Sequence, residues 1–296
     1  MDTHREITIE KDGTSPMLRI AVPNKGSLSE AAGEMLHEAG YRQRKDRELM
    51  VIDPDAGVEL FYLRPRDIAV YVGSGRLDIG ITGRDLLLDS RADAEEILPL
   101  GFGKSTFRFA GRPGTGSTLE DLKGRRIATS YPGIVQAHLD RAGVPAEVVK
   151  LDGAVEISIQ LGVADVIADV VSTGTTLRQA GLELIGSPIL ESEAVVIKRR
   201  DAEPAAGSDQ FLRRLQGVLV ARKYVMMDYD IRAERLREAV DLTPGLESPT
   251  VSPLHSEGWV AVRAMVPREQ TQRIMDDLWE IGARAILVTD IRACRI

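Results

Sequence analysis

The chain has 296 residues and a mass of 32.4 kDa, enough for two or three domains of ordinary size. Only 4% of the residues are aromatic, and the net charge is -7, so neither stacking platforms nor a basic surface for nucleic acid is expected. The single cysteine, Cys294, excludes an internal disulfide framework and favours a reducing, cytoplasmic compartment. No apolar run reaches the roughly 18 residues of a membrane span.

The first part of the chain alternates short apolar runs with helical patterns. Residues 1–16 are polar and predict a flexible leader, with Met17 as a functional start. A capping box of Ser27 and Glu30 begins a helix that Gly40 ends. The remaining pattern predicts strands at 18–22, 50–52, 58–63 and 77–81, helices at 67–72 and 85–89, and an extended segment at 98–110.

A second α/β pattern follows and is bounded by a polar linker at residues 200–208. Parallel sheets of this kind bind ligands at the carboxyl ends of their strands, so we expect two lobes with a cleft between them. Strands are predicted at 126–129, 146–151 and 166–171, and helices at 119–123, 132–141, 154–161 and 175–180.

The C-terminal segment has a different order, βαββαβ, which predicts a ferredoxin-like α+β domain. The pattern predicts a helix at 209–217 leading into a long strand at 218–228, then a helix at 233–239. Strands at 250–254 and 259–266, a helix at 268–281 and a strand at 285–291 complete it. Cys294 is placed with the last strand, as a structural residue.

The segment from Asp169 to Thr176 is the strongest candidate binding site. An apolar strand runs into a loop of small hydroxyl residues around Gly174, and a helix then begins. Backbone N–H groups at such a helix start favour an anion, so the loop suits a phosphate group. An ordinary capped helix after a buried strand is the alternative that this local pattern leaves open.

Weaker candidates stand beside it. Glu156 opens a helix and could either cap it or hold a hydroxyl or a metal-bound water. Strand-to-helix loops at 23–27, 64–66, 73–75 and 82–85 add glycines, hydroxyls and cations. The four histidines show no metal-ligand spacing.

The segment from Glu156 to Leu177 resembles the signature of the ATP phosphoribosyltransferases of histidine biosynthesis. The matching residues are Glu156, Gly162, Ala164, Ile167, Asp169, Val170, Thr173, Gly174, Thr176 and Leu177. The resemblance extends over nearly the whole chain from Met17, through the stretches LRIAVPNKGSLSE, LRPRDIAVYVGSGRLDIGITGRDLL, LDGAVEIS and TPGLESPTVSPL. The C-terminal ferredoxin-like unit is typical of the long form of this family.

The resemblance implies an α/β fold of two periplasmic-binding-protein-like lobes with a central cleft, followed by an ACT-like regulatory domain. We therefore expect catalytic lobe I at residues 17–107, with a return segment at about 190–206. Lobe II, which would bind phosphoribosyl pyrophosphate (PRPP), is expected at 108–189, and the regulatory domain at 207–296.

The implied reaction joins N1 of ATP to C1 of PRPP and releases pyrophosphate, with Mg²⁺ as cofactor. Catalytic roles are implied for Glu156, Asp169 and Lys25, with Glu156 or Asp169 reaching the metal through substrate and water. The implied PRPP-binding residues are Asp169, Ser172, Thr173, Gly174, Thr175 and Thr176. The implied ATP-binding residues are Lys25, Gly26, Arg64, Gly73 and Asp85.

The resemblance also implies regulation and assembly. Histidine would inhibit from a site at Asp230, Leu246, Thr250 and Ala285, with AMP as a further candidate inhibitor. The family implies a homo-oligomer, a dimer or a hexamer, and neither a nucleic-acid nor a membrane partner. A solute-binding protein or a free-standing amino-acid sensor are the alternative function classes. The sensor would leave the first 200 residues or so unexplained.

Overall fold

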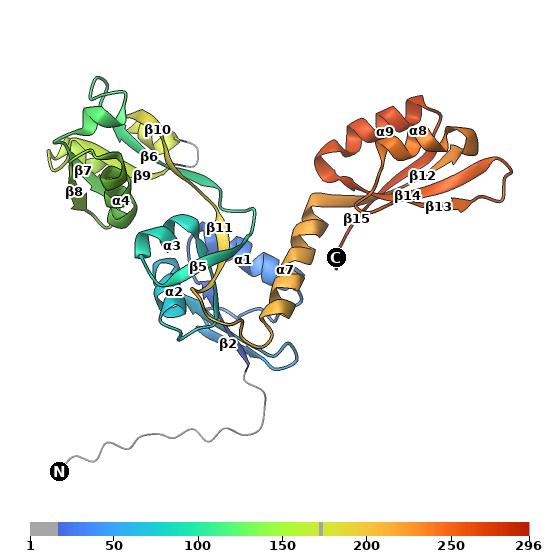
Figure 1. The fold of residues 1–296 in the computed structure, drawn as a ribbon, viewed down its shortest axis with the longest axis horizontal. Coiled ribbons are helices and arrows are strands. Elements are labelled where there is room, and N and C mark those ends of the chain that lie inside the picture. Colours follow the sequence, from blue (N-terminus) through green and yellow to red (C-terminus); the bar gives the residue numbers. More distant parts are fainter. Residues whose placement is uncertain (1–16, 172–173, 296) are drawn as a thin grey trace, which may run out of the picture. The chain divides into compact units, whose positions relative to one another are not determined.

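This computed structural model describes residues 17–171 and 174–295, which form three sheets (Figure 1). The leader predicted at residues 1–16 lies outside the described residues, as do Ser172 and Thr173. Contacts divide the chain into two units. The first unit comprises the chain up to Ala32 together with Arg44–Asp209. The second unit comprises Gly33–Gln43 and Gln210–Ile296. The first unit contains two of the sheets.

Lobe I, as we use the term, is the six-stranded sheet with order β2-β3-β1-β4-β11-β5 and its helices. The central strands β1, β3 and β4 are parallel, while β2 and β11 run antiparallel to their neighbours. The strands are β1 (Leu18–Pro23), β2 (Met50–Asp53), β3 (Val58–Leu63), β4 (Ile79–Gly83), β5 (Ala94–Pro99) and β11 (Ala194–Arg199). The helices are α1 (Ser27–Glu38), α2 (Pro65–Gly73) and α3 (Arg84–Ser90).

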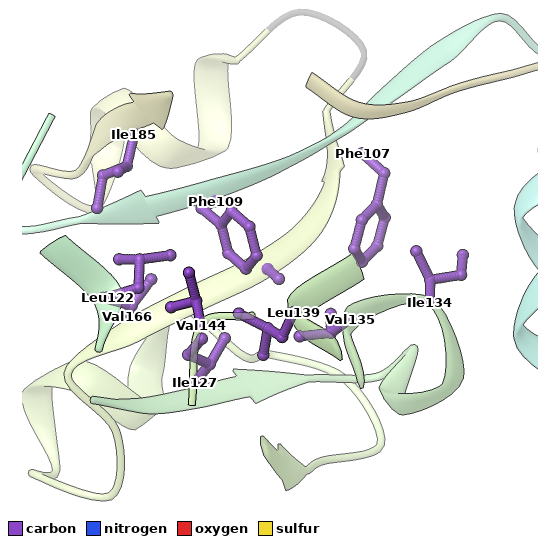
Figure 2. Close-up of a cluster of buried hydrophobic side chains, with 11 residues drawn as sticks. Phe107, Phe109, Leu122, Ile127, Ile134, Val135, Leu139, Val144, Val166 and Ile185 are labelled. Carbon is purple, nitrogen blue, oxygen red and sulfur yellow. The ribbon is translucent and has the colours of Figure 1, made fainter. Parts of the chain in front are cut away.

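Lobe II is the five-stranded sheet with order β10-β6-β9-β7-β8. Its strands are β6 (Ser105–Gly111), β7 (Arg126–Thr129), β8 (Glu147–Lys150), β9 (Val166–Val171) and β10 (Glu183–Ser192). Its helices are η1 (Leu119–Leu122), α4 (Pro132–Ala142), α5 (Ile157–Gln160) and α6 (Thr175–Gln179). Figure 2 shows one side of its core, where Phe107 and Phe109 of β6 pack among aliphatic side chains of α4 and β9. This core fixes β9, and with it the chain that leads into the candidate phosphate loop.

The chain crosses between the lobes twice. Residues 100–104 lead from β5 to β6, and Glu193 alone separates β10 from β11. The crossings lie side by side, because the Leu100 N–H donates to the Ala194 carbonyl and the Ala194 N–H donates to the Phe102 carbonyl, each at 2.9 Å. The extended segment predicted at 98–110 is therefore two strands with the first crossing between them.

Two further predictions in this unit need correction. The helix predicted from Ala154 is confined to Ile157–Gln160, since Ala154 has a positive φ of 46° that no α-helix accommodates. The strand β10 was not foreseen. It pairs antiparallel with β6 and carries a register shift between Ile185 and Leu190, so its apolar pattern is interrupted.

The C-terminal sheet has the order β13-β14-β12-β15 with antiparallel pairing throughout, which confirms the ferredoxin-like arrangement. Its strands are β12 (Tyr224–Arg232), β13 (Thr250–Pro253), β14 (Trp259–Pro267) and β15 (Arg284–Asp290). The helices are η2 (Ala233–Arg235), α8 (Leu236–Leu242), η3 (Arg268–Gln270) and α9 (Thr271–Glu280). Cys294 lies beyond β15 and not within it, contrary to the prediction.

The helix before this sheet is longer than predicted. Helix α7 runs over Ser208–Lys223, so the strand predicted from Val218 begins only at Tyr224. The apolar run at 218–221 looked like a strand, but buried residues recur at helical spacing, at Phe211, Leu215, Val218 and Ala221. Within residues 17–171 and 174–295, no helix combines the length and apolar character needed to cross a bilayer.

Candidate active site

A cavity of about 600 Å³ lies in the first unit and is lined by residues of both lobes. Most of its lobe I lining comes from the short loops and helix starts that follow the carboxyl ends of the parallel strands β1, β3 and β4. Parallel α/β sheets bind ligands at this edge, where helix starts and loop N–H groups converge. The lining residues are Lys25, Gly26, Ser27, Leu28, Arg64, Pro65, Arg66, Asp67, Gly83, Asp85, Leu86, Gly103, Lys104, Ser105, Tyr131, Val170 and Ser192.

The cavity is rich in cations without acidic partners. Among the described residues, the side chains of Lys25, Arg64 and Lys104 form no ion pair. Two acidic residues, Asp67 and Asp85, share the lining. Unpaired cations gathered in a concave site favour an anionic ligand.

One lobe I cation reaches across to lobe II. The guanidinium of Arg66 lies 4.4 Å from the ring centroid of Tyr131 and 3.4 Å from the Asp89 carboxylate. Asp89 in turn accepts hydrogen bonds from the N–H groups of Gly133 (2.8 Å) and Ile134 (3.3 Å) at the start of α4. A carboxylate is stabilised at a helix start, so this contact holds the two walls of the cavity together.

The pKa of the Tyr131 phenol is shifted by its surroundings. Burial and then the negative charge of Asp85 raise its pKa, while the nearby Arg66 opposes the shift. The phenol therefore stays protonated at neutral pH and can act as a hydrogen-bond donor.

Asp169 and Glu156 both lie on the lobe II side, and their charges interact. Burial raises the pKa of the Asp169 carboxyl, a hydrogen bond from the Val170 N–H (2.8 Å) opposes the shift, and the Glu156 charge adds to it. Arg66 and Asp85 also act on Asp169 electrostatically, so this carboxylate is within reach of the charges that line the cavity. Val170, the next residue, is part of the lining.

The candidate phosphate loop is described only in part. Gly174 has a φ of 71°, a conformation that side chains with a Cβ rarely adopt, and it precedes α6. Thr175 is exposed at the helix start. Ser172 and Thr173 lie outside the described residues, and the side chain of Thr176 is not described.

The comparisons with known proteins cover almost the whole chain. The family model described as "ATP phosphoribosyltransferase" matches residues 64–217, and the one described as "HisG, C-terminal domain" matches residues 221–293. An ATP phosphoribosyltransferase of Streptomyces coelicolor is 72% identical over 95% of this chain and 100% of its own length. One from Streptomyces avermitilis is 70% identical, with the same coverage of both chains.

The chain belongs to the ATP phosphoribosyltransferase family. It is of the long form, with the C-terminal domain. A solved structure of the ATP phosphoribosyl transferase (HisG:HisZ) complex from Thermotoga maritima resembles it with a TM-score of 0.59 and 28% identity. That likeness covers 68% of this chain and 97% of the solved chain. The expected fold class, two periplasmic-binding-protein-like lobes followed by a ferredoxin-like domain, is therefore confirmed.

Seen as an ATP phosphoribosyltransferase, the chain brings together most of the residues expected on the ATP side. Lys25, Gly26, Arg64 and Asp85 all line the cavity. Gly73 does not. It lies at the end of α2, where a Cβ would come within 2.9 Å of the Asp93 nitrogen, so close packing of helix and loop explains this glycine.

The residues expected to bind histidine lie on one sheet and the loop before it. In the ladder between β12 and β15, Asp230 lies opposite Arg284. The next residue, Ala285, has a positive φ of 51° and lies at a register shift of β15. Thr250 of β13 lies on the far side of β14, and Leu246 lies in the exposed loop that leads to it. Among the described residues, the Asp230 carboxylate has no hydrogen bond or ion pair.

Several lining residues were not identified from the sequence as candidates, among them Tyr131, Lys104 and Ser192. Tyr131 follows a predicted strand and precedes Pro132, the same strand-to-helix signal that marked Lys25, so the sequence held a cue for it. Lys104 and Ser192 lie at the two crossings between the lobes. The sequence held no local signal for them, because Lys104 lies inside the segment predicted as continuously extended and the strand β10 that ends at Ser192 was not predicted.

Proposed function

We propose that the cavity is the site where this ATP phosphoribosyltransferase joins N1 of ATP to C1 of PRPP and releases pyrophosphate, the first step of histidine biosynthesis. The observation that carries the proposal is the set of cations in one cavity, Lys25, Arg64 and Lys104, that form no ion pair within the described part of the chain. Both substrates are polyanions, and in a protein with a net charge of -7 such a local concentration of positive charge favours their binding.

We assign the lobe I wall to ATP and to the departing pyrophosphate. Lys25 and Arg64 follow β1 and β3 and would meet phosphate oxygens, with arginine offering two parallel donors. Gly26, with a φ of 77° and no neighbour within 4 Å of a Cβ position, lets the backbone turn there and leaves room for a ligand.

We assign the lobe II wall to PRPP. The loop at residues 172–176 would receive the 5-phosphate through N–H and hydroxyl groups, as its sequence predicts. Asp169, together with Glu156, would accept hydrogen bonds from the ribose hydroxyls.

Displacement at C1 forms the N1–C1 bond and breaks the bond from C1 to the pyrophosphate oxygen, through a state with positive charge on the ribose ring. N1 of adenine carries its own lone pair, so no general base is needed. The main task of the chain is to align two anions and to stabilise the leaving group. The Asp169 and Glu156 carboxylates, next to the ribose, would also stabilise its developing positive charge.

Mg²⁺ fits the donor set. Among the described residues no cluster of three or more His, Cys, Asp or Glu is placed to hold a metal ion alone. Mg²⁺ is commonly bound by one or two carboxylates together with substrate phosphates, and Asp169 with Glu156 offers such a pair. When bound, the ion would neutralise charge on the pyrophosphate.

We further propose that histidine inhibits from the C-terminal sheet near Asp230, whose carboxylate has no partner among the residues described and suits an amino group. Leu246, Thr250 and Ala285 would complete that site, and AMP would compete with ATP in the cavity. The proposal includes a homo-oligomer, a dimer or a hexamer, in the cytoplasm.

The test of the ATP assignment replaces the Lys25 ammonium. Lys25→Met should raise the KM for ATP about tenfold or more, because a charged hydrogen bond to phosphate contributes about 1.5–3 kcal/mol. The measurement is steady-state pyrophosphate release with Mg²⁺ present. Lys150→Met, at the exposed end of β8, is the matched control and should leave the constants unchanged. An unaltered KM for ATP in Lys25→Met would contradict the assignment.

A further inference from the structure

The start of helix α3 is attached to the second crossing between the lobes. The Arg84 N–H donates to the Glu193 carbonyl at 3.0 Å, and the Asp85 N–H donates to Ser192 Oγ at 3.1 Å. Ser192 is the last residue of β10 and pairs with Ser105 of β6, so it belongs to the lobe II sheet. Asp85 belongs to lobe I, and the bond between them therefore bridges the lobes.

A second bond closes a ring between the same two residues. The Ser192 hydroxyl donates to Asp85 Oδ1 at 2.9 Å while its oxygen accepts the Asp85 N–H. Asp85 is 7% exposed and Ser192 5% exposed, so water competes little for either bond. A Cβ on Gly83 would collide with Asp85 Oδ1, so the carboxylate can take this position only because residue 83 is glycine.

Side chains around the crossing reinforce it. Arg84 forms paired hydrogen bonds of 2.8 Å with the Glu96 carboxylate and a 3.3 Å contact with Glu193. The other Glu193 oxygen accepts the Gly101 N–H of the first crossing at 2.9 Å. Both crossings and the first turn of α3 thus form one hydrogen-bonded unit.

We infer that Ser192 is a positioning residue that fixes the Asp85 carboxylate at the ATP side of the cavity and ties its orientation to the crossing between the lobes. This rests on the proposed function and on assigning Asp85, a lining residue that the family resemblance implies for ATP binding, to contact with substrate. Oδ1 accepts the Ser192 hydroxyl, so the ring sets the direction in which the carboxylate faces the cavity and the nearby Tyr131 phenol. A movement of lobe II that displaces Ser192 would therefore redirect Asp85.

The experiment is a double-mutant cycle on the full chain with Ser192→Ala and Asp85→Asn, read as kcat/KM for ATP from pyrophosphate release with PRPP and Mg²⁺. Ser192→Ala alone should lower kcat/KM about ten- to a hundredfold, the value of a hydrogen bond to a charged group. In the Asp85→Asn background it should have almost no further effect, because the carboxylate on which it acts is already gone.

Two further variants separate positioning from folding. Ser192→Thr keeps the hydroxyl and should retain more activity than Ser192→Ala. Ser90→Ala is the matched control, since the Ser90 hydroxyl also donates one bond, to the Leu87 carbonyl, and accepts one, from the Ala92 N–H, on the same helix. It should leave kcat/KM unchanged. Unfolding midpoints of all variants report any loss of stability.

The outcomes are distinguishable. If the two substitutions multiply in their effects, or if Ser192→Ala retains full activity while Asp85→Asn loses it, the positioning role is wrong and the ATP site stands. If Asp85→Asn retains full activity, the substrate contact of Asp85 is wrong, and the positioning role falls with it.

Discussion

Two aspartates near β9 have surroundings that affect the stability of the fold in opposite ways. Asp165, just before the strand, binds Arg126 at 2.9 Å and also accepts its backbone N–H at 3.0 Å. These bonds lower the pKa of the Asp165 carboxyl, whereas burial raises the pKa of Asp169. The first carboxylate therefore stabilises the fold at neutral pH, and the second one destabilises it.

Replacing each aspartate by asparagine should shift the unfolding midpoint of the ligand-free protein in opposite directions at about pH 7. Asp169→Asn should raise the unfolding midpoint by a few degrees, about 1 kcal/mol, while abolishing most activity. Asp165→Asn should lower the midpoint and keep the activity.

The direction of each pKa shift determines how the stability of the fold depends on pH. A raised folded-state pKa means that the cost of Asp169 appears as pH rises above its unfolded pKa, about 3.9. A lowered pKa means that the contribution of Asp165 is lost as pH falls below that value. Thermal unfolding across pH measures both. The Asp169→Asn difference should have vanished by about pH 3.9, whereas the Asp165→Asn difference should shrink only below that pH. A lower midpoint for Asp169→Asn at neutral pH would contradict the assigned cost of burial.

At the scale of an element, helix α7 carries a glycine in its interior. Gly217 costs helix stability, by about 1 kcal/mol relative to alanine, so its presence needs a packing reason. A Cβ there would collide with the Cys294 carbonyl and come within 2.8 Å of Arg295. The segment after β15 therefore lies directly against α7.

Gly217→Ala should consequently destabilise the full chain by about 1–3 kcal/mol. In a chain that ends after Asp290 the collision is gone, and the same substitution should stabilise by about 0.5–1 kcal/mol. Urea unfolding of the four proteins measures this. Gly33→Ala in α1 is the control, since its Cβ would be 3.7 Å from the nearest atom, Gln43 Oε1, and fits. Equal effects of Gly217→Ala in both lengths would show that the C-terminal segment does not contact α7.

At the scale of the whole molecule, the second unit begins earlier than the polar linker suggests, because it includes residues 33–43. The Tyr41 ring lies 5.6 Å from that of Phe211 and beneath the Arg214 guanidinium, and Arg222 binds Glu38 at 2.8 Å. Helix α7 therefore covers residues at and after the end of α1, although it follows the linker in sequence.

Truncations at two points should behave differently. A chain that ends after Lys223 keeps α7 and should stay folded and active, while a chain that ends after Gly207 exposes Tyr41 and should unfold at a midpoint several degrees lower. Both should lose inhibition by histidine if the C-terminal sheet holds it. Unfolding midpoints and pyrophosphate release with and without histidine measure this. A shortened, active chain that histidine still inhibits would refute the proposed regulatory site.

The sequence alone was enough for the family, the α/β alternation and most strands, because these depend on local periodicity and on a contiguous motif from Glu156 to Leu177. It also indicated Lys25, Arg64 and Asp85, since each follows a strand whose carboxyl end is predictable.

Only the tertiary structure decided what depends on contacts between distant segments. It extended α7 through Lys223, where an apolar run had suggested a strand, and it placed Gly73 in helix packing outside the cavity. It also brought Ser192 to Asp85, residues 107 positions apart in the chain. Periodicity and motifs report the burial of one segment at a time, and a hydrogen bond between two lobes leaves no pattern in either segment.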